Sequence, residues 1–302
     1  MFLTGKYFNR PASVRNKPTP KDFLSGFLRL IRIQNLVIVA FTQLFVRIFL
    51  IGPREEWKRI LADPYFYLIV LSTLLIAAAG YIINDYFDIK IDIVNKPKRV
   101  IIGRYLKRRM AIGTHQLLNV LGVLCGLVVS YKVALVNIFS VSLLWLYSER
   151  YKRQPLIGNV AVSLLTALSL LILSVEYPRH HGLVLIYAVF AFFISLIREI
   201  VKDIEDRRGD AAHGCRTLPV VLGVRKTKRV LYVLIVLFTL ILLVWSQYLG
   251  NRALAISFGL LVLPLAWLLV RLRRAHTRKD FSSVSTICKV IMLIGLLTMI
   301  LI

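Results

Sequence analysis

Nine long apolar segments run through this chain and restrict its possible folds more than any other feature. Several approach the roughly 20 residues that an α-helix needs to cross a bilayer, and the shorter ones can extend through their flanks. Backbone polar groups in lipid must be hydrogen-bonded internally, which a helix achieves. We therefore predict an all-α, polytopic membrane protein, a bundle of nine transmembrane helices around a central cavity. The segments are residues 23–51, 64–85, 110–131, 133–148, 157–175, 182–202, 229–248, 253–270 and 284–302.

The segment before the first apolar run, residues 1–22, is short and polar. It is basic and contains Pro11, Pro18 and Pro20, but it lacks an apolar core followed by a small-residue cleavage site. It is therefore interpreted as a cytosolic tail and not as a signal peptide. Residues 23–302 are predicted to form a single transmembrane domain.

Basic residues are in large excess, with 40 Lys and Arg against 15 Asp and Glu. In a soluble protein this would suggest a nucleic-acid partner, but 58% of the residues are hydrophobic and the bases cluster in short loops. Such clusters favour membrane orientation and an anionic ligand, so no nucleic acid is expected. Residues 1–32 and the loops on the same side of the bilayer, counted with the adjoining helix ends, hold 32 of the bases, and the opposite loops hold six. We predict a cytosolic N-terminus and an outside C-terminus in the cell membrane.

Two acidic motifs follow apolar segments, and both fall on the predicted cytosolic side. Each has carboxylates at positions i, i+3 and i+7, which share one face of a helix. Three carboxylates on one face repel each other unless a cation lies between them, and Mg²⁺ takes oxygen ligands that it often shares with substrate phosphates. A solvated helix end of mixed charge explains either motif taken alone. The acidic residues are Asp85, Asp88 and Asp92 in the first motif and Asp203, Asp206 and Asp210 in the second.

The strings NDYFDIKID (84–92) and DRRGD (206–210) resemble the two aspartate-rich motifs of the UbiA superfamily of intramembrane prenyltransferases. This resemblance covers nearly the whole chain. It implies Mg²⁺-assisted transfer of an isoprenyl group from its diphosphate to an acceptor within the bilayer. The metal ligands that it implies are Asn84, Asp85, Asp88, Asp92, Asp203, Asp206 and Asp210. Among them, the implied catalytic residues are Asp85, Asp88, Asp92, Asp206 and Asp210.

The superfamily also has a Tyr-x-x-x-Lys motif that helps to bind diphosphate, and this chain departs from it. Tyr147 is followed by Arg150 and Lys152, three and five residues later, so either base is a candidate for the lysine role. An aromatic belt with basic anchors is the alternative interpretation of this segment. The residues expected to bind substrate are Asn35, Asn84, Lys96, Arg99, Tyr147, Arg150, Lys152, Lys202 and Arg207.

Four strings, YIINDYFDIKIDIVNKP, KDIEDRRGD, RTLPVVLG and KRQPLIGN, resemble one branch of the superfamily. That branch transfers a geranylgeranyl group to geranylgeranylglyceryl phosphate, which implies a role in phospholipid biosynthesis. Prenylation of an aromatic or quinone-precursor acceptor is the alternative within the enzyme class. An ion-coupled transporter is the alternative outside it, although transporter sites lie near the bilayer midplane and both acidic motifs lie at segment ends.

A few polar residues lie inside the apolar segments. Asn35, in the string RIQNL, resembles a superfamily position near the active cavity. Gln43 and Arg47 either face a cavity or make interhelical hydrogen bonds and reach toward the interface. His115 is interpreted as a hydrogen-bonded bundle residue and not as a ligand.

Overall fold

The structure, a computed structural model, describes residues 20–52, 56–95, 100–103, 106–248 and 252–301. These described residues are mainly helical and contain no strand beyond an isolated bridge between Ile102 and Leu106. Nine helical segments within these ranges are long and apolar enough to cross a membrane, which confirms the predicted all-α polytopic fold. The elements are α1 (Pro20–Leu30), α2 (Ile33–Phe45), the π-helix η1 (Val46–Ile51), α3 (Trp57–Leu61), α4 (Pro64–Asn95), α5 (Arg108–Val129), α6 (Tyr131–Glu149), η4 (Tyr151–Arg153), α7 (Ile157–Glu176), α8 (His181–Ala212), α9 (Leu218–Val221), α10 (Gly223–Tyr248), α11 (Arg252–Arg274), α12 (Arg278–Thr298) and η5 (Met299–Leu301).

Helices α4 and α8 contain 32 residues each and carry the two acidic motifs. Hydropathy predicted that these segments end at residues 85 and 202, whereas both helices continue through the motifs. Helical backbone hydrogen bonds do not require apolar side chains, so the fall in hydropathy marks the membrane boundary and not the helix end. A helix of this length extends about 48 Å against roughly 30 Å of hydrocarbon, and its last turns therefore leave the apolar core.

The first apolar segment is divided into α1 and α2. Arg32 lies between the two helices with a φ of 52°, in the left-handed region that a non-glycine residue seldom adopts. The membrane span therefore begins at Ile33 and ends at Ile51, after the π-helix η1. Hydropathy did not predict this break because a change of direction at one residue leaves the apolar composition unchanged. Residues 1–19 of the predicted tail lie outside the described residues.

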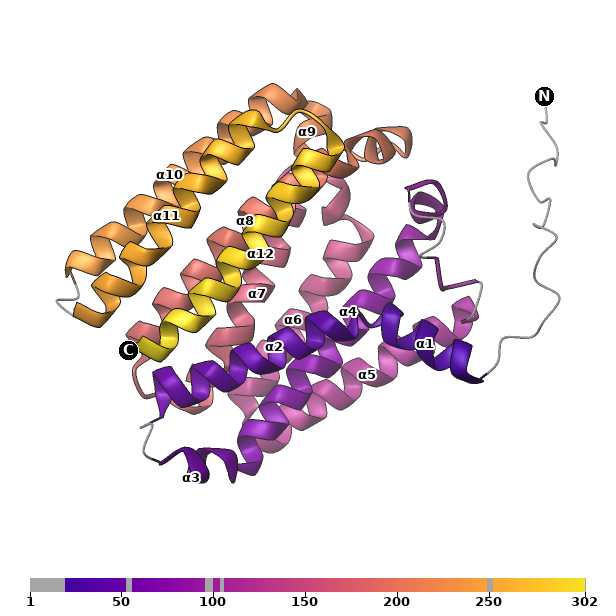
Figure 1. The fold of residues 1–302 in the computed structure, drawn as a ribbon. Coiled ribbons are helices and arrows are strands. Elements are labelled where there is room, and N and C mark those ends of the chain that lie inside the picture. Colours follow the sequence, from indigo (N-terminus) through magenta and orange to yellow (C-terminus); the bar gives the residue numbers. More distant parts are fainter. Residues whose placement is uncertain (1–19, 53–55, 96–99, 104–105, 249–251, 302) are drawn as a thin grey trace, which may run out of the picture.

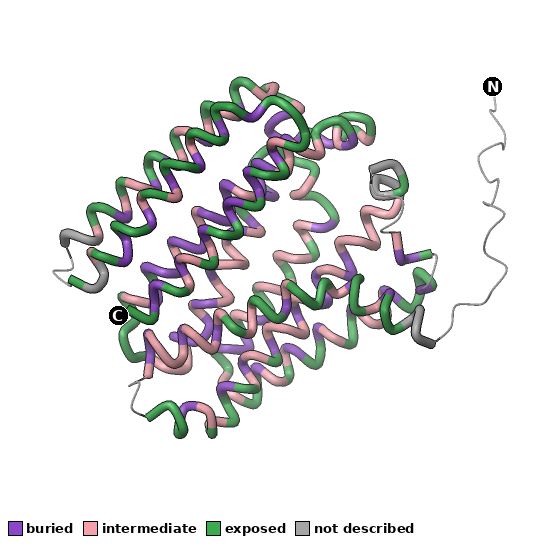
Figure 2. The backbone as a smooth tube through the Cα atoms, in the orientation of Figure 1, coloured by how far each residue is buried: buried purple, intermediate pink, exposed green. Residues whose placement is uncertain are grey.

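Helix α8 lies at the centre of the bundle, between the N-terminal and C-terminal groups of spans (Figure 1). One face of α8, which includes Phe190, contributes to a hydrophobic core with Phe238 of α10 and Phe258 of α11. Another face, which includes Tyr187, contributes to a second core with η1, α4 and α7. Buried residues follow α8 along much of its length in Figure 2, and 72% of its most apolar stretch is buried. The position of α8 fixes where the second acidic motif leaves the bundle.

Two polar residues inside the spans make interhelical hydrogen bonds. The amide nitrogen of Gln43 donates to the Thr73 hydroxyl at 3.0 Å and to the Ser169 carbonyl at 2.8 Å. The buried ring of His115 donates from Nδ1 to the Ala79 carbonyl at 3.0 Å. The contacts of both residues agree with the structural interpretation of these residues.

Arg47 lies at the opposite end of the bundle from the acidic motifs. Its guanidinium is 3.5 Å from the Asp63 carboxylate and 4.0 Å from the centroid of the Tyr177 ring. The Tyr177 hydroxyl also donates to Asp63, and burial together with this hydrogen bond raises the pKa of Tyr177. These contacts connect η1, the start of α4 and the end of α7, so Arg47 has a structural role.

Candidate active site

The first acidic motif meets the junction between α1 and α2. Arg32 donates from Nη2 to the Asp85 carboxylate at 3.0 Å, and its guanidinium lies 4.8 Å from the centroid of the Tyr81 ring. Asn35 donates to the Tyr81 hydroxyl at 3.3 Å. A left-handed conformation at a residue such as Arg32 is unfavourable and persists only where surrounding contacts hold it. Here those contacts place a guanidinium directly on a carboxylate of α4.

Asp88, one turn further along α4, binds the ammonium of Lys152. The Lys152 Nζ atom is 2.7 Å from Asp88 Oδ1 and 3.4 Å from the Asn84 carbonyl oxygen. The Asn84 side chain donates to the other Asp88 oxygen at 3.0 Å. Burial lowers the pKa of the Lys152 ammonium, and the Asp88 carboxylate opposes that shift. Lys152 belongs to η4, the short turn after α6, so this pair connects α4 with the loop between α6 and α7.

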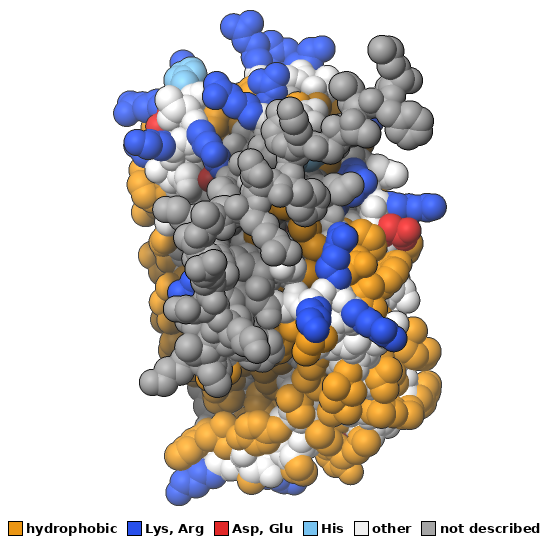
Figure 3. Space-filling model, turned by 90° about the vertical axis from the view of Figure 1, so that its right-hand side faces the viewer, with side chains coloured by type: hydrophobic (Ala, Val, Ile, Leu, Met, Phe, Trp, Pro, Cys, Tyr) orange, Lys and Arg blue, Asp and Glu red, His pale blue; other side chains and the backbone are white. Residues whose placement is uncertain are grey.

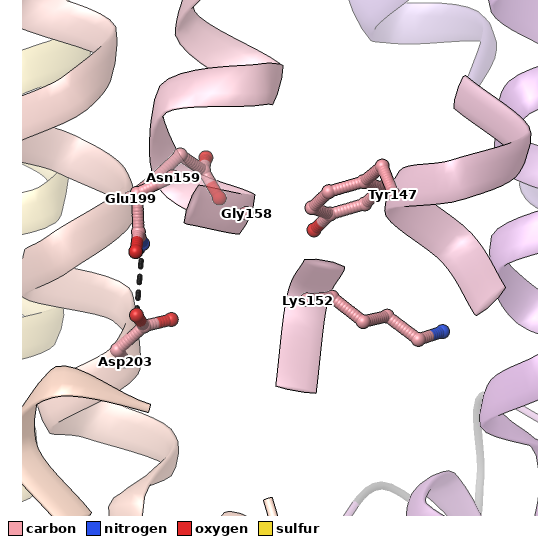
Figure 4. Close-up of a pocket in the computed structure, with 6 residues that line it drawn as sticks. All are labelled: Tyr147, Lys152, Gly158, Asn159, Glu199 and Asp203. Carbon is pink, nitrogen blue, oxygen red and sulfur yellow. Dashed lines mark hydrogen bonds between the residues drawn. The ribbon is translucent and has the colours of Figure 1, made fainter. Parts of the chain in front are cut away.

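A small polar pocket lies between this loop and α8, as Figure 4 shows. Tyr147 and Lys152 lie on one side of it, and Glu199 and Asp203 lie on the other. Because Lys152 contacts Asp88 and lines this pocket with Asp203, the two acidic motifs lie at the same end of the bundle, as predicted. Both α4 and α8 end toward the top of Figure 1. The pocket is lined by Tyr147, Lys152, Gly158, Asn159, Glu199 and Asp203.

The carboxylates of the second motif have partners on three different elements. Asn159 of α7 donates to Asp203 at 2.8 Å. Arg278, at the start of α12, lies 3.3 Å from Asp206. The Asp210 carboxylate accepts from the hydroxyl of Thr217 at 3.3 Å. The last turns of α8 are therefore connected to α7, α12 and the segment before α9.

Glu199 lies one turn before the second motif and is 8% exposed. It accepts from Arg198 at 2.8 Å and from Lys202 at 2.9 Å. A buried charge in a membrane-spanning segment is unfavourable unless it is paired, and these two bases provide the pairing. Lys202, predicted to bind substrate, therefore lies next to the pocket through its contact with Glu199.

The structure brings many of the predicted site residues to this end of the bundle. Two of the predicted bases, Arg150 and Arg207, do not line the pocket. Lys152 lines the pocket, whereas the side chain of Arg150 is exposed at the end of α6. Arg207 is exposed on the last turns of α8. Lys96 and Arg99 lie outside the described residues, and so does the side chain of Asp92, whose backbone belongs to α4.

Four residues of the site were not predicted from the sequence: Arg32, Asn159, Glu199 and Arg278. All four fall outside the aspartate-rich motifs. The partners of Arg32, Asn159 and Arg278 are distant along the chain, whereas those of Glu199 lie on the same turn of α8. The only available signal was that a polar residue near the end of an apolar segment faces a cavity or a partner. That signal applies to Arg32, Asn159 and Glu199, and Arg278 lies outside the predicted segments.

The oxygen donors at this end fit Mg²⁺. Among the described side chains, no three acidic, histidine or cysteine groups converge on one point. Mg²⁺ commonly binds through one or two carboxylates and completes its coordination with water and substrate phosphates. Asp88 with Asn84 on α4, and Asp206 with Asp210 on α8, provide donor sets of that kind. The residues therefore suit an ion that shares its ligands with an anionic substrate.

Comparison with known proteins agrees with this arrangement. Residues 55–294 match the UbiA prenyltransferase family. The digeranylgeranylglyceryl phosphate synthase of Sulfurisphaera tokodaii is 31% identical over 253 residues, which cover 83% of this chain and 88% of that protein. The synthase of the same name from Methanoregula boonei is 40% identical over 165 residues, which cover 53% of this chain and 58% of that protein.

Solved structures share the fold. A structure of digeranylgeranylglyceryl phosphate synthase superposes with a TM-score of 0.69 at 25% identity and covers 92% of this chain and 98% of its own. A UbiA homologue from Archaeoglobus fulgidus, bound to DMAPP and Mg²⁺, superposes with a TM-score of 0.65 at 16% identity. That superposition covers 91% of this chain and 99% of the homologue, and it concerns the fold alone.

Gly158 provides a test of how Lys152 is positioned. A Cβ atom at Gly158 would lie 2.7 Å from the Tyr151 carbonyl oxygen and 2.9 Å from the Lys152 Cα atom. Both neighbours are backbone atoms, so Gly158→Ala is expected to displace η4 and weaken binding of inorganic diphosphate in the presence of Mg²⁺ about tenfold. Calorimetry on the purified protein measures this change.

Gly259→Ala is the matched control, because a Cβ atom at Gly259 would meet no atom within 4 Å. We expect it to bind diphosphate as the wild type does. Equal affinities for the two variants would contradict the proposed positioning role of Gly158.

Proposed function

The chain belongs to the UbiA prenyltransferase family and is an integral membrane prenyltransferase, and we propose that it transfers a geranylgeranyl group from its diphosphate to geranylgeranylglyceryl phosphate. The product would be a lipid with a second ether bond. The relatives named digeranylgeranylglyceryl phosphate synthase support this acceptor over an aromatic or quinone-precursor acceptor. Membership of a prenyltransferase family favours an enzyme over the ion-coupled transporter that was the alternative from the sequence.

One observation carries the proposal: Lys152 contacts Asp88 of the first motif and lines a pocket with Asp203 of the second. An isoprenyl diphosphate has a highly charged headgroup and an apolar chain. The pocket provides a base that can bind the headgroup directly and carboxylates that can bind it through Mg²⁺, and the spans around it are apolar. This end of the bundle is therefore suited to hold the donor with its headgroup near both acidic motifs.

Departure of the diphosphate is the difficult part of the reaction, because negative charge accumulates on it as the C1–O bond breaks. We propose that Lys152 and Arg32 donate hydrogen bonds to its oxygens, since charge-assisted bonds to phosphate are strong. Mg²⁺, when held by Asp88 with Asn84 and by Asp206 with Asp210, would stabilise the leaving group as a Lewis acid. Asp85, Asp92 and Asp203 are further candidate ligands.

The allylic carbon must be protected from water until the acceptor hydroxyl attacks it. Phe87 and Trp145 make an edge-to-face contact near Lys152, with ring centroids 5.9 Å apart. Lys152 Nζ lies 5.9 Å from the centroid of the Phe87 ring. We propose that these rings contribute an apolar wall that excludes water and stabilises positive charge on the allyl group.

We further propose that the N-terminus, the tail 1–22 and the acidic ends of α4 and α8 are cytosolic in the cell membrane, with residues 23–302 as one prenyltransferase domain. Figure 3 supports this orientation, because Lys and Arg side chains gather toward the upper end above a band rich in hydrophobic side chains. An alkaline phosphatase fused to the C-terminus should be active outside the cell. Activity only of a phosphatase fused to the N-terminus would contradict this orientation.

The experiment that tests the proposed reaction uses purified protein, radiolabelled geranylgeranyl diphosphate and a panel of acceptors. We expect Mg²⁺-dependent labelling of geranylgeranylglyceryl phosphate with release of diphosphate. Labelling of 4-hydroxybenzoate or another aromatic acceptor in its place would contradict the acceptor assignment. Absence of labelling with every acceptor of the panel would contradict the assignment of geranylgeranyl diphosphate as the donor as well.

The bases after α6 give a second prediction. Lys152→Met is expected to raise the donor KM roughly tenfold or more, because it removes a charged donor from the pocket. Arg150→Met is the control, since Arg150 is exposed at the end of α6, and its donor KM should stay within about twofold of the wild type. Steady-state kinetics with varied donor measure both values. An equal effect of the two substitutions would contradict the assignment of the lysine role to Lys152.

A further inference from the structure

Arg278 reaches the second acidic motif from the last membrane-spanning helix. Its Nη2 atom lies 3.3 Å from Asp206 Oδ1, although the two residues are 72 positions apart in the sequence. The Arg278 side chain is 58% exposed and that of Asp206 is 22% exposed. Arg278 therefore lies at the rim of the site, with much of its guanidinium accessible to a ligand.

The backbone that carries Arg278 is held firmly. Thr277 and Asp280 form a capping box at the start of α12, in which each side chain accepts from the backbone of the other. Lys228 of α10 donates to the Ala275 carbonyl at 3.1 Å, and it also binds the Arg273 carbonyl. The capping box engages the backbone amides of Thr277 and Asp280 and so fixes the turn from which the Arg278 side chain extends toward Asp206.

Arg278 repeats a pattern found twice at the first motif. Arg32 binds Asp85 and Lys152 binds Asp88, and in each pair the base comes from another element than the carboxylate. Both of those bases lie where the donor diphosphate is proposed to bind. Arg278 is the corresponding base at the second motif. Its guanidinium has five N–H donors, and the contact with Asp206 uses one of them.

If Arg278 had only a structural role, its contact with Asp206 would contribute little to the stability of the fold. Ion pairs with an exposed member contribute little to stability, because solvent screens them and the long side chain loses freedom. Arginine is well suited to phosphate, which it binds through two parallel hydrogen bonds. The position, exposure and chemistry of Arg278 therefore point to a phosphate ligand.

We propose that Arg278 binds a phosphate group of a substrate beside Asp206. This inference rests on the proposed function, which brings two phosphate-bearing substrates to the site. One source is the diphosphate of the isoprenyl donor, and the other is the phosphomonoester of the lipid acceptor. In either case α12 contributes directly to substrate binding, and the C-terminal spans are part of the active site.

The test compares Arg278→Gln with Lys279→Gln in the purified full-length protein with Mg²⁺. Lys279 is the adjacent residue of the same helix turn and is also exposed, so both variants lose one positive charge at the same end of the bundle. Calorimetry measures binding of inorganic diphosphate and, separately, of glycerol 1-phosphate. Steady-state kinetics give KM for geranylgeranyl diphosphate and for geranylgeranylglyceryl phosphate.

We expect Arg278→Gln to weaken one of the two ligands about tenfold or more, with KM of the matching substrate rising in parallel. Weaker diphosphate binding identifies the donor as the phosphate source, and weaker glycerol 1-phosphate binding identifies the acceptor. Arg278→Lys should recover part of the affinity. Lys279→Gln should stay within about twofold of the wild type for both ligands.

Equal binding and equal KM values for Arg278→Gln and Lys279→Gln would overturn the inference. Thermal unfolding of each variant identifies any loss of folded protein, and Arg278→Lys then serves as the folded comparison. If the wild type bound diphosphate but transferred no prenyl group, the proposed function would fail. The binding comparison would still decide whether Arg278 contacts phosphate.

Discussion

Carboxylates at the ends of two membrane-spanning helices must be neutralised, and much of the architecture at this end follows from that requirement. A buried carboxylate without a partner is strongly unfavourable, and each carboxylate of the motifs whose side chain the structure describes has a base or a hydrogen-bond donor beside it. Arg32 binds Asp85 and Lys152 binds Asp88, and the more exposed Arg278 binds Asp206 in a pair that contributes little to stability. These pairs connect the junction of α1 and α2, the turn η4 and the start of α12 to the acidic ends of α4 and α8.

The same contacts prepare the site for its chemistry. Bases that are already fixed on carboxylates need little rearrangement when an anionic headgroup arrives, and preorganised charges are more effective than mobile ones. Lys152 illustrates this, because burial and the contact with Asp88 hold its ammonium beside the pocket. The central position of α8 in two hydrophobic cores keeps the second motif in place.

Hydropathy was sufficient to predict the presence and order of the spans, because crossing a bilayer demands a minimum apolar length, but it did not predict the break at Arg32. The spacing of Asp85 and Asp88 predicted correctly that they follow one another along a helix. Spacing did not resolve the choice between Arg150 and Lys152. Helix α6 ends at Glu149 and a tighter turn follows, so the distance from Tyr147 along the sequence no longer predicts direction. The contact of Arg278 with Asp206 depends on how α12 packs against α8, which no local pattern encodes.

We propose that the acidic motifs serve prenyl transfer and not stability, and Asp206→Asn tests this most directly. Thermal unfolding and Mg²⁺-dependent turnover should be measured on the same preparation, with turnover expressed per folded molecule. We predict that turnover falls about 10² to 10³-fold, because the variant loses a carboxylate that would hold the Mg²⁺ ion stabilising the departing diphosphate. A variant that unfolds early while its folded molecules transfer prenyl groups at a near wild-type rate would contradict the account.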